Sequence, residues 1–259
     1  MNLLILATIA IGLAVDQHWA FHGQLAVAAA TWLILCVVWS RSSAARPALA
    51  ACLVYATAGE VFLSLVWRLY EYRLGNIPLF VPPGHVLLFF VGMQIAERIP
   101  ARSEWWIAAL AAPLVAAFAW NGRDTLGPLL YGLFLACLWL SPSRRLYATM
   151  FVLSLAMELY GTWMGNWMWS PRVPWLGLTS ANPPLAAGAF YCILDLLVVM
   201  TVNKWGQSQL SITRTFRQES RPLSKVDSDP TYSYPASGSL KPSVASHQAA
   251  TCSARSSPR

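Results

Sequence analysis

Residues 47–70 read PALAACLVYATAGEVFLSLVWRLY, and residues 146–165 read LYATMFVLSLAMELYGTWMG. Each stretch is long and apolar enough to form a transmembrane helix, yet each carries one glutamate, Glu60 or Glu158. A carboxylate inside a membrane helix costs roughly 2.5–3.5 kcal/mol on insertion scales, and it usually faces the interior of a helix bundle. These stretches therefore predict a membrane helix bundle in which two buried carboxylates have either a chemical function or a structural partner.

The composition of the chain agrees with a polytopic membrane protein. Of its 259 residues, 56% are hydrophobic and only 11% are charged, whereas soluble domains carry about 25% charged residues. The long apolar runs lie within residues 1–205, and we expect them to form an all-α bundle of about eight transmembrane helices. The expected spans are 3–19, 24–39, 47–70, 82–95, 104–120, 127–140, 146–165 and 185–202.

The net charge of +7 reflects membrane topology rather than nucleic-acid binding, because the basic residues lie in short connections and near the C-terminus. The connections at 41–46, 98–102 and 144–145 are richer in arginine than the opposite connections. Cytoplasmic connections of membrane proteins are enriched in Lys and Arg, so we expect an inner-membrane protein with both termini in the cytoplasm. Residues 206–259 are rich in Ser, Pro and basic residues, which predicts a disordered cytoplasmic tail.

The two halves of the bundle repeat the same polar marks. A tryptophan, a serine and two arginines precede each glutamate, and the spacing from the tryptophan is 21 residues for Glu60 and 19 for Glu158. An aromatic loop and then a Pro-Pro pair follow each glutamate. Four helices per half preserve the orientation, so we expect two parallel four-helix repeats, about 1–97 and 104–205, related by an axis along the membrane normal. The alternative is a chance similarity between apolar segments.

Four ionisable residues inside the spans are candidates for acid–base chemistry: Glu60, Glu158, His85 and Asp195. A rise of 1.5 Å per residue puts both glutamates at a matching depth, and it puts Asp195 near the midplane of the last span. His85 follows a Pro-Pro helix start, where the helix dipole favours the neutral imidazole. Structural roles remain open for all four, as hydrogen-bond partners of loop groups or as an interfacial anchor.

Aromatic and asparagine residues after the two glutamates form a second group of candidates. Electron-rich aromatic faces bind isoprenoid chains and stabilise a developing carbocation, although an interfacial aromatic belt is the alternative. The expected substrate-binding residues are Trp67, Tyr70, Tyr72, Asn76, Trp163, Asn166, Trp167, Trp169 and Asn182. We expect no cofactor and no metal, because the chain has no Gly-rich phosphate loop and no histidine pair with a third ligand in sight.

Residues 157–195 resemble the core signature of the bacterial and archaeal carotenoid hydratase family. That signature has a membrane glutamate, a nearby glycine, a glycine followed by an aromatic-x-aromatic patch, and a glycine and a proline before the next helix. The matching residues here are Glu158, Gly161, the GNWMW patch from Gly165, Pro174 and Gly177, with a looser copy in Glu60, the YEY patch from Tyr70, and Pro78. Tryptophan replaces the usual tyrosines, and the Pro-Pro pair departs from the signature. The resemblance implies an all-helical membrane enzyme that adds water across an isoprenoid double bond, or a related isomerase or cyclase.

These patterns favour an enzyme that performs hydration, isomerisation or cyclisation on an isoprenoid or other lipophilic substrate. Glu158 is then the expected acid and Glu60 its partner. The alternative is a proton-coupled transporter or a small-molecule-binding membrane protein, and a third possibility is an assembly subunit without chemistry. The expected partners are membrane lipid and a lipophilic small molecule. The cytoplasmic halves of the spans are nearly all apolar, which favours a one-sided cavity over a polar path between the two faces of the membrane.

Overall fold

The computed structural model describes residues 1–219, with side-chain burial described for residues 1–205. Met1–Ile212 form one compact unit, to which the following description applies. The described chain is mainly helical, which confirms the all-α prediction. Its α-helices are α1 (Asn2–Arg41), α2 (Arg46–Glu60), α3 (Val81–Ala96), α4 (Ser103–Trp120), α5 (Gly127–Leu140), α6 (Arg144–Met164) and α7 (Gly188–Glu219). Shorter elements are the 3-10 turn η1 (Ser43–Ala45), the π-helical η2 (Val61–Val66), and the strands β1 (Tyr70–Tyr72) and β2 (Trp167–Trp169).

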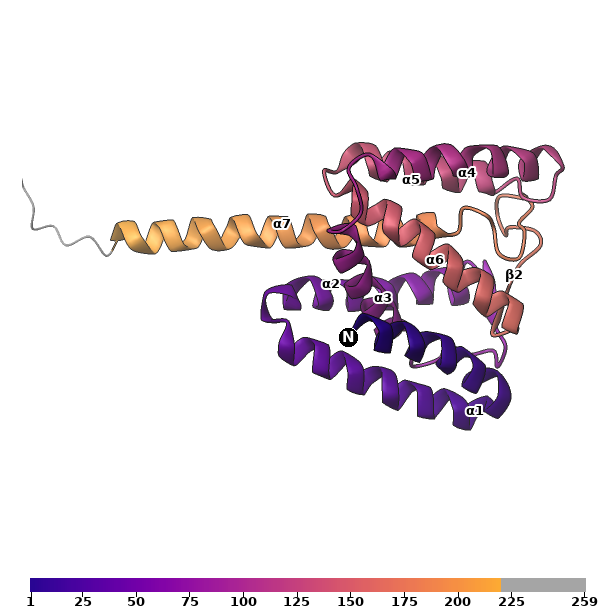
Figure 1. Cartoon of the computed structure of the whole chain (residues 1–259), viewed down its shortest axis with the longest axis horizontal. Helices are drawn as coiled ribbons and strands as arrows, with labels where there is room; N and C mark the ends of the chain where they lie inside the picture. The colour runs from indigo at the N-terminus through magenta and orange to yellow at the C-terminus, as the bar shows by residue number, and fades with distance from the viewer. Residues whose placement is uncertain (220–259) are drawn as a thin grey trace, which may run out of the picture. The chain divides into compact units, whose positions relative to one another are not determined.

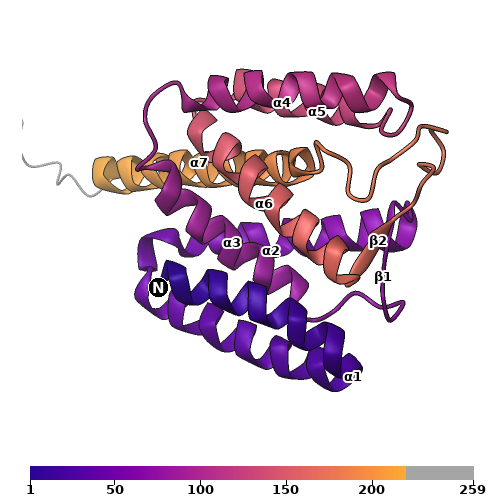
Figure 2. The same ribbon diagram turned by 45° about the vertical axis from the view of Figure 1, so that its right-hand side comes forward.

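Helix α1 is bent into a hairpin at Trp19 and Ala20, where the backbone leaves helical geometry. Figures 1 and 2 show its two legs side by side. Gly23 makes this possible, because a Cβ atom there would overlap the backbone carbonyl of Val15 on the other leg. With α1 counted as two legs, the described residues contain a helical segment at each of the eight predicted spans.

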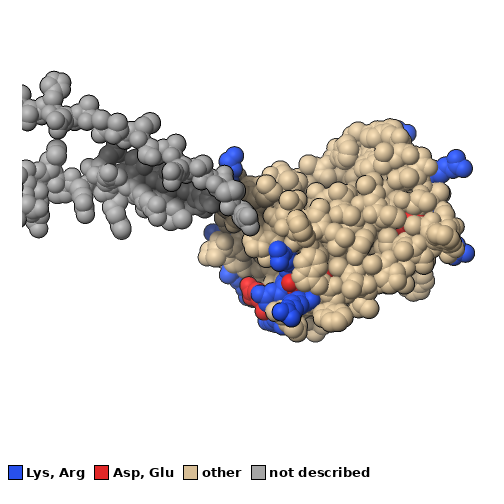
Figure 3. Space-filling model, turned by 90° about the horizontal axis from the view of Figure 1, so that it is seen from above, with Lys and Arg blue, Asp and Glu red and all other residues tan. Residues whose placement is uncertain are grey.

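Four helical stretches of the described residues are long and apolar enough to cross a membrane: Asn2–Arg41, Ser43–Val66, Ser103–Trp120 and Gly188–Trp205. The helices α3 and α5 are apolar but shorter. In Figure 3 the charged side chains lie toward two ends of the visible surface, and a broad uncharged area separates them. Length, composition and charge distribution together identify a membrane protein.

Helices α3 and α6 form the centre of the unit. Residues Val86–Phe89 and Val91 of α3 are all buried, as expected for a helix that is apolar on every side. The helices α1 and α2 pack against α3, whereas α4 and α5 pack against α6. Where α3 crosses α6, a Cβ atom at Gly92 would overlap the sulfur atom of Met150, so the glycine allows the two helices to approach closely.

The two Pro-Pro pairs have different local structures. Pro82 and Pro83 occupy the first turn of α3, as the sequence predicts. Pro183 and Pro184 lie in a loop, and α7 begins at Gly188, three residues after its expected start. Helix α7 also continues to Glu219, past the expected end of the last span at 202. The remainder of the predicted tail, 220–259, lies outside the described residues.

Candidate functional site

A short β-ribbon joins the two loops that follow the glutamates. Strands β1 and β2 pair antiparallel, with Tyr70 opposite Trp169 and Tyr72 opposite Trp167. Because side chains alternate along a strand, these four aromatic rings share one face of the ribbon and are buried. The exposed face carries the central pair, Glu71 and Met168. The ribbon thus directs matching aromatic pairs from the two loops toward the interior.

Glu60 accepts two hydrogen bonds from the tyrosines of β1. The Tyr70 and Tyr72 hydroxyls both donate to Oε2 of Glu60, each at 2.7 Å. The carboxyl is 6% exposed, and its other oxygen, Oε1, makes none of the hydrogen bonds that the described residues show. Glu60 is the last residue of α2, and β1 begins ten residues later with Tyr70. We call Glu60 with these two tyrosines the tyrosine cradle.

Glu158 of α6 is held in a matching way by β2. The indole Nε1 atoms of Trp167 and Trp169 donate to its Oε2 at 2.8 and 3.0 Å. The Tyr191 hydroxyl of α7 donates to Oε1 at 3.0 Å. Glu158 is also 6% exposed, so all three bonds are made in a nearly dry environment. We call Glu158 with Trp167 and Trp169 the tryptophan cradle.

Local sequence features build the tryptophan cradle. A Cβ atom at Gly161 would overlap the Trp167 ring, so glycine leaves room for that ring against α6. Gly165 ends α6 in the left-handed conformation, with φ +79°, and turns the chain back toward Glu158. Asn182 then accepts a hydrogen bond from the Trp169 backbone N–H at 3.0 Å. This loop contact fixes the position of β2.

His85 and Tyr191 stand beside the two glutamates. Their rings are stacked, with centroids 4.2 Å apart and an interplanar angle of 12°. Nε2 of His85 is buried and has no hydrogen-bond partner among the described residues. Sequence reasoning missed Tyr191. The available signal was an aromatic residue one helical turn before Asp195, in the same span as a membrane carboxyl.

Two cavities meet at these side chains. The first, which we call the α1 chamber, has a volume of about 60 Å³ and lies against the two legs of α1 and the start of α3. The second, which we call the α7 chamber, has a volume of about 370 Å³ and lies between α2–η2 and α7. Both are lined by Glu60, Tyr70, His85, Glu158 and Tyr191, and otherwise mainly by apolar side chains. The paired carboxyls therefore stand at the junction of two apolar cavities.

The structure brings several other predicted residues to the same place. Tyr72 and Trp167 line the α1 chamber, and Trp67 and Trp169 line the α7 chamber. Trp67 also donates from Nε1 to the carbonyl oxygen of Pro174 at 2.9 Å.

The predicted residues that line neither chamber are Trp163, Asp195, Asn76, Asn166 and Asn182. Trp163 is 78% exposed, because five residues at 100° each put it on the opposite side of α6 from Glu158. Asp195 is fully buried and has no hydrogen bond to either carboxyl oxygen among the described residues. It lines neither chamber.

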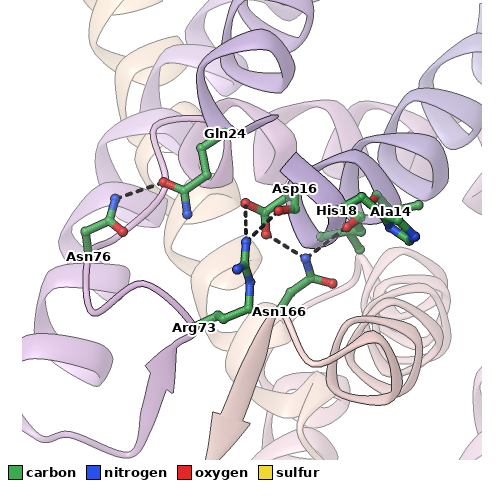
Figure 4. A network of polar contacts seen from close by, with 8 residues as sticks. Ala14, Asp16, His18, Gln24, Arg73, Asn76 and Asn166 are labelled. Carbon is green, nitrogen blue, oxygen red and sulfur yellow. Dashed lines mark hydrogen bonds and ion pairs between the residues drawn. The ribbon is translucent and has the colours of Figure 1, made fainter. Parts of the chain in front are cut away.

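Asn76 and Asn166 form hydrogen bonds with residues of α1, which Figure 4 shows, and do not line the chambers. Nδ2 of Asn166 donates to Oδ2 of Asp16 at 2.6 Å, and Nη2 of Arg73 donates to the Asp16 carbonyl oxygen at 2.6 Å. Asn76 donates to Oε1 of Gln24 at 3.0 Å. The bend of α1 is thus tied to the loops that carry β1 and β2. Asp16 and Arg73 were not among the predicted site residues, although an aspartate interrupting an apolar run was visible.

The described residues contain no group of three or more His, Cys, Asp and Glu side chains arranged to hold a metal ion. Comparison of the chain with protein-family models, with curated proteins and with solved structures found no match.

Proposed function

We propose that this protein is a membrane enzyme that performs acid–base chemistry on an alkene of an isoprenoid or similar lipophilic substrate. The observation that carries the proposal is the position of Glu60 and Glu158, which both face the junction of two apolar chambers. A buried carboxyl pair is costly. Such a pair beside a cavity that suits an apolar chain places a proton donor where an alkene could be protonated. The local resemblance of residues 157–195 to carotenoid hydratases supports the same class of reaction.

The hydrogen bonds favour different protonation states for the two glutamates. Glu158 accepts two bonds at Oε2 from indole N–H groups, which can only donate, and a third at Oε1 from the Tyr191 hydroxyl. Donors directed at a carboxyl favour its ionised form. Glu60 receives both of its bonds at Oε2, and tyrosine hydroxyls can rotate to donate or accept. Its Oε1 is therefore the better place for a proton. Two neighbouring carboxyls share a proton readily because ionising both is unfavourable.

Glu60 is then the acid and Glu158 the anion, the reverse of the roles expected from the sequence. Glu60 donates the proton on Oε1 to one alkene carbon, and the cation forms on the other. The Glu158 carboxylate and the aromatic faces of the cradles stabilise that cation.

His85, with its unpartnered Nε2, then accepts a proton. If the proton comes from a carbon beside the cation, the product is an isomer or a cyclised chain. If it comes from a water molecule that adds to the cation, the product is an alcohol. In either case, proton transfer from His85 back to Glu60 completes the cycle.

We also propose that the eight helical segments all span an inner membrane as two parallel repeats, with both termini in the cytoplasm. The antiparallel pairing of β1 with β2 supports the repeat, because a two-fold axis along the membrane normal relates strands lying in the membrane plane in this way. The arginine bias of the connections supports the orientation. In a cysteine-free background, an impermeant thiol reagent applied to intact cells should label Ser170→Cys and not Ser143→Cys. The opposite pattern would reject this topology.

Solvent deuterium tests the chemistry without knowledge of the product. The full-length protein in lipid nanodiscs is incubated in D₂O with polyprenyl alkenes of 15 to 40 carbons, and carbon-bound deuterium is measured by mass spectrometry. Protonation of an alkene incorporates deuterium whether the product is hydrated, isomerised or cyclised. Glu60→Gln should reduce incorporation by about 10²–10⁴-fold, and Glu71→Gln on the exposed face of the ribbon should leave it unchanged. An absence of incorporation, together with proton flux across liposomes carrying the protein, would favour the transporter instead.

A further inference from the structure

The α7 chamber reaches the outer surface of the helix bundle. Two of its lining residues, Phe62 of η2 and Leu197 of α7, are 46% and 41% exposed. Small residues, Ala58 and Gly59, line the same wall of α2. The space between α2–η2 and α7 is therefore open to the region that lipid chains occupy around a membrane helix bundle.

Hydrogen bonds frame this opening at both ends. On one side, the Tyr55 hydroxyl of α2 is 2.8 Å from Oγ1 of Thr201 on α7. On the other side, Nε1 of Trp67 donates to the Pro174 carbonyl oxygen, and the Trp67 ring stacks on Trp175 with centroids 5.8 Å apart. The opening is thus a bounded feature between two linked helices. It differs from the contact of α3 with α6, which Gly92 and Met150 close tightly.

The polar groups of the α7 chamber lie deep or are already bonded. Glu60, Tyr70, Glu158 and Tyr191 belong to the hydrogen-bonded junction, and His85 stacks within it. Among the residues that the structure describes, no Lys or Arg lines the chamber. A charged head group would therefore find no partner in the opening. An apolar chain, in contrast, would exchange its contacts with lipid for contacts with apolar side chains. The smaller α1 chamber lies beyond the junction, behind α1.

From these observations we propose that the ligand is a single-chain lipid that enters from the bilayer between η2 and α7. Its apolar end enters first, passes the carboxyl pair and stops in the α1 chamber, and its head group stays outside. The proposal rests on the proposed function only in assuming a lipophilic ligand. Gly59 then controls access, and Gly84, which lines the α1 chamber, limits how far the chain extends past the carboxyls.

Three glycines provide matched variants. Ideal Cβ atoms at Gly59, Gly84 and Gly132 have no described atom within 4 Å apart from their own stretch of helix. All three positions are inside helices, where leucine is a better helix former than glycine. Gly59→Leu fills the α7 chamber, Gly84→Leu fills the α1 chamber, and Gly132→Leu lies in neither. All three variants should fold, so differences in ligand binding among them show which chamber the ligand occupies.

The probe is geranylgeraniol carrying a photoreactive diazirine either at its apolar end or beside its hydroxyl group. It is added to the full-length protein in nanodiscs, and the labelled peptides are identified by mass spectrometry. In the unsubstituted protein the apolar-end diazirine should label α1 or α3, and the hydroxyl-side diazirine should label η2 or 193–197 of α7. Gly59→Leu should reduce labelling by both diazirine probes at least tenfold. Gly84→Leu should remove labelling by the apolar-end probe and keep labelling by the hydroxyl-side probe. Gly132→Leu should change neither labelling.

Equal labelling of the Gly59→Leu variant, the reverse pattern of the two probes, or an absence of label in these segments would overturn the proposal. Labelling as expected in Glu60→Gln protein whose deuterium incorporation is reduced would support the route together with the assigned chemistry. Expected labelling in a protein that never incorporates deuterium would leave the route intact and reject the chemistry. The two proposals therefore fail separately.

Discussion

The tyrosine cradle and the tryptophan cradle hold equivalent carboxyls with different donors. In the first, two hydroxyls meet one oxygen of Glu60, and no donor among the described residues meets the other. In the second, two indoles and Tyr191 occupy both oxygens of Glu158. Hydroxyls can reverse their hydrogen bonds, and indoles cannot. The comparison shows that two similarly placed carboxyls have different sets of donors, and this difference underlies the proposed roles of Glu60 as acid and Glu158 as anion.

The largest expected effect is the difference in activity between the Glu60→Gln and Glu158→Gln variants. Glu60→Gln keeps the shape of the side chain and still accepts from both tyrosines, but it carries no acidic proton. Loss of general-acid catalysis costs about 10²–10⁴-fold in rate, so deuterium incorporation should fall by that factor while the amount of folded protein stays the same. Glu158→Gln should reduce the rate less, because the acid remains. A greater loss in Glu158→Gln would reverse the assignment of the two roles.

The second effect compares the strength of single hydrogen bonds. A bond to a charged group contributes about 1.5–3 kcal/mol, and a bond between neutral groups about 0.5–1.5 kcal/mol. Trp169→Phe should therefore destabilise the protein more than Tyr72→Phe, measured by unfolding titrations in detergent. Trp67→Phe controls for ring size, because its N–H donates to a neutral carbonyl. Equal losses at the two cradles would mean that the glutamates share one protonation state.

The third effect concerns the glycine that only one cradle contains. Gly161 lies three residues after Glu158, and the position three residues after Glu60 is Leu63. Gly161→Ala should push against the Trp167 ring and destabilise the protein by about 1–3 kcal/mol, the usual range for overpacking. Deuterium incorporation should fall as well. Gly132→Ala is the matched control, since its Cβ atom meets no described atom within 4 Å apart from its own stretch of helix. Unchanged stability and deuterium incorporation in Gly161→Ala would show that the Trp167 ring can adopt another position.

The smallest effect is expected on the outer face of the same ribbon. Glu71 is exposed and makes none of the hydrogen bonds described for the cradles. Glu71→Gln should change stability by less than about 0.5 kcal/mol, as surface substitutions usually do, and should leave deuterium incorporation within the error of measurement. A large effect would indicate that the outer face, and not only the inner one, takes part in the reaction.

The helical segments were predictable, because long apolar runs separated by polar residues are a strong local signal. The break expected after residue 19 coincides with the bend at Trp19 and Ala20. The matching of Glu60 with Glu158 was also visible, since two polar marks in apolar runs are easy to align. These features need only the period and length of a helix.

The ribbon and its contacts were not predictable in the same way. Three-residue strands such as YEY and WMW have too few residues to differ from an interfacial aromatic belt, and their pairing joins segments about one hundred residues apart. Tyr191 reaches Glu158 only because of how α7 packs on α6. Asn166 was expected to bind substrate, yet its side chain donates to Asp16 and to the Leu13 carbonyl oxygen of α1. Each of these contacts depends on tertiary packing.

The junction between the two chambers has a stereochemical consequence for the proposed reaction. Glu60 comes from α2 and Glu158 from α6, so a chain that lies between the chambers meets the two carboxyls on different walls. Each face of a planar double bond is then distinguished from the other. The proton from Glu60 arrives on one face only, and any new stereocentre forms with a single handedness.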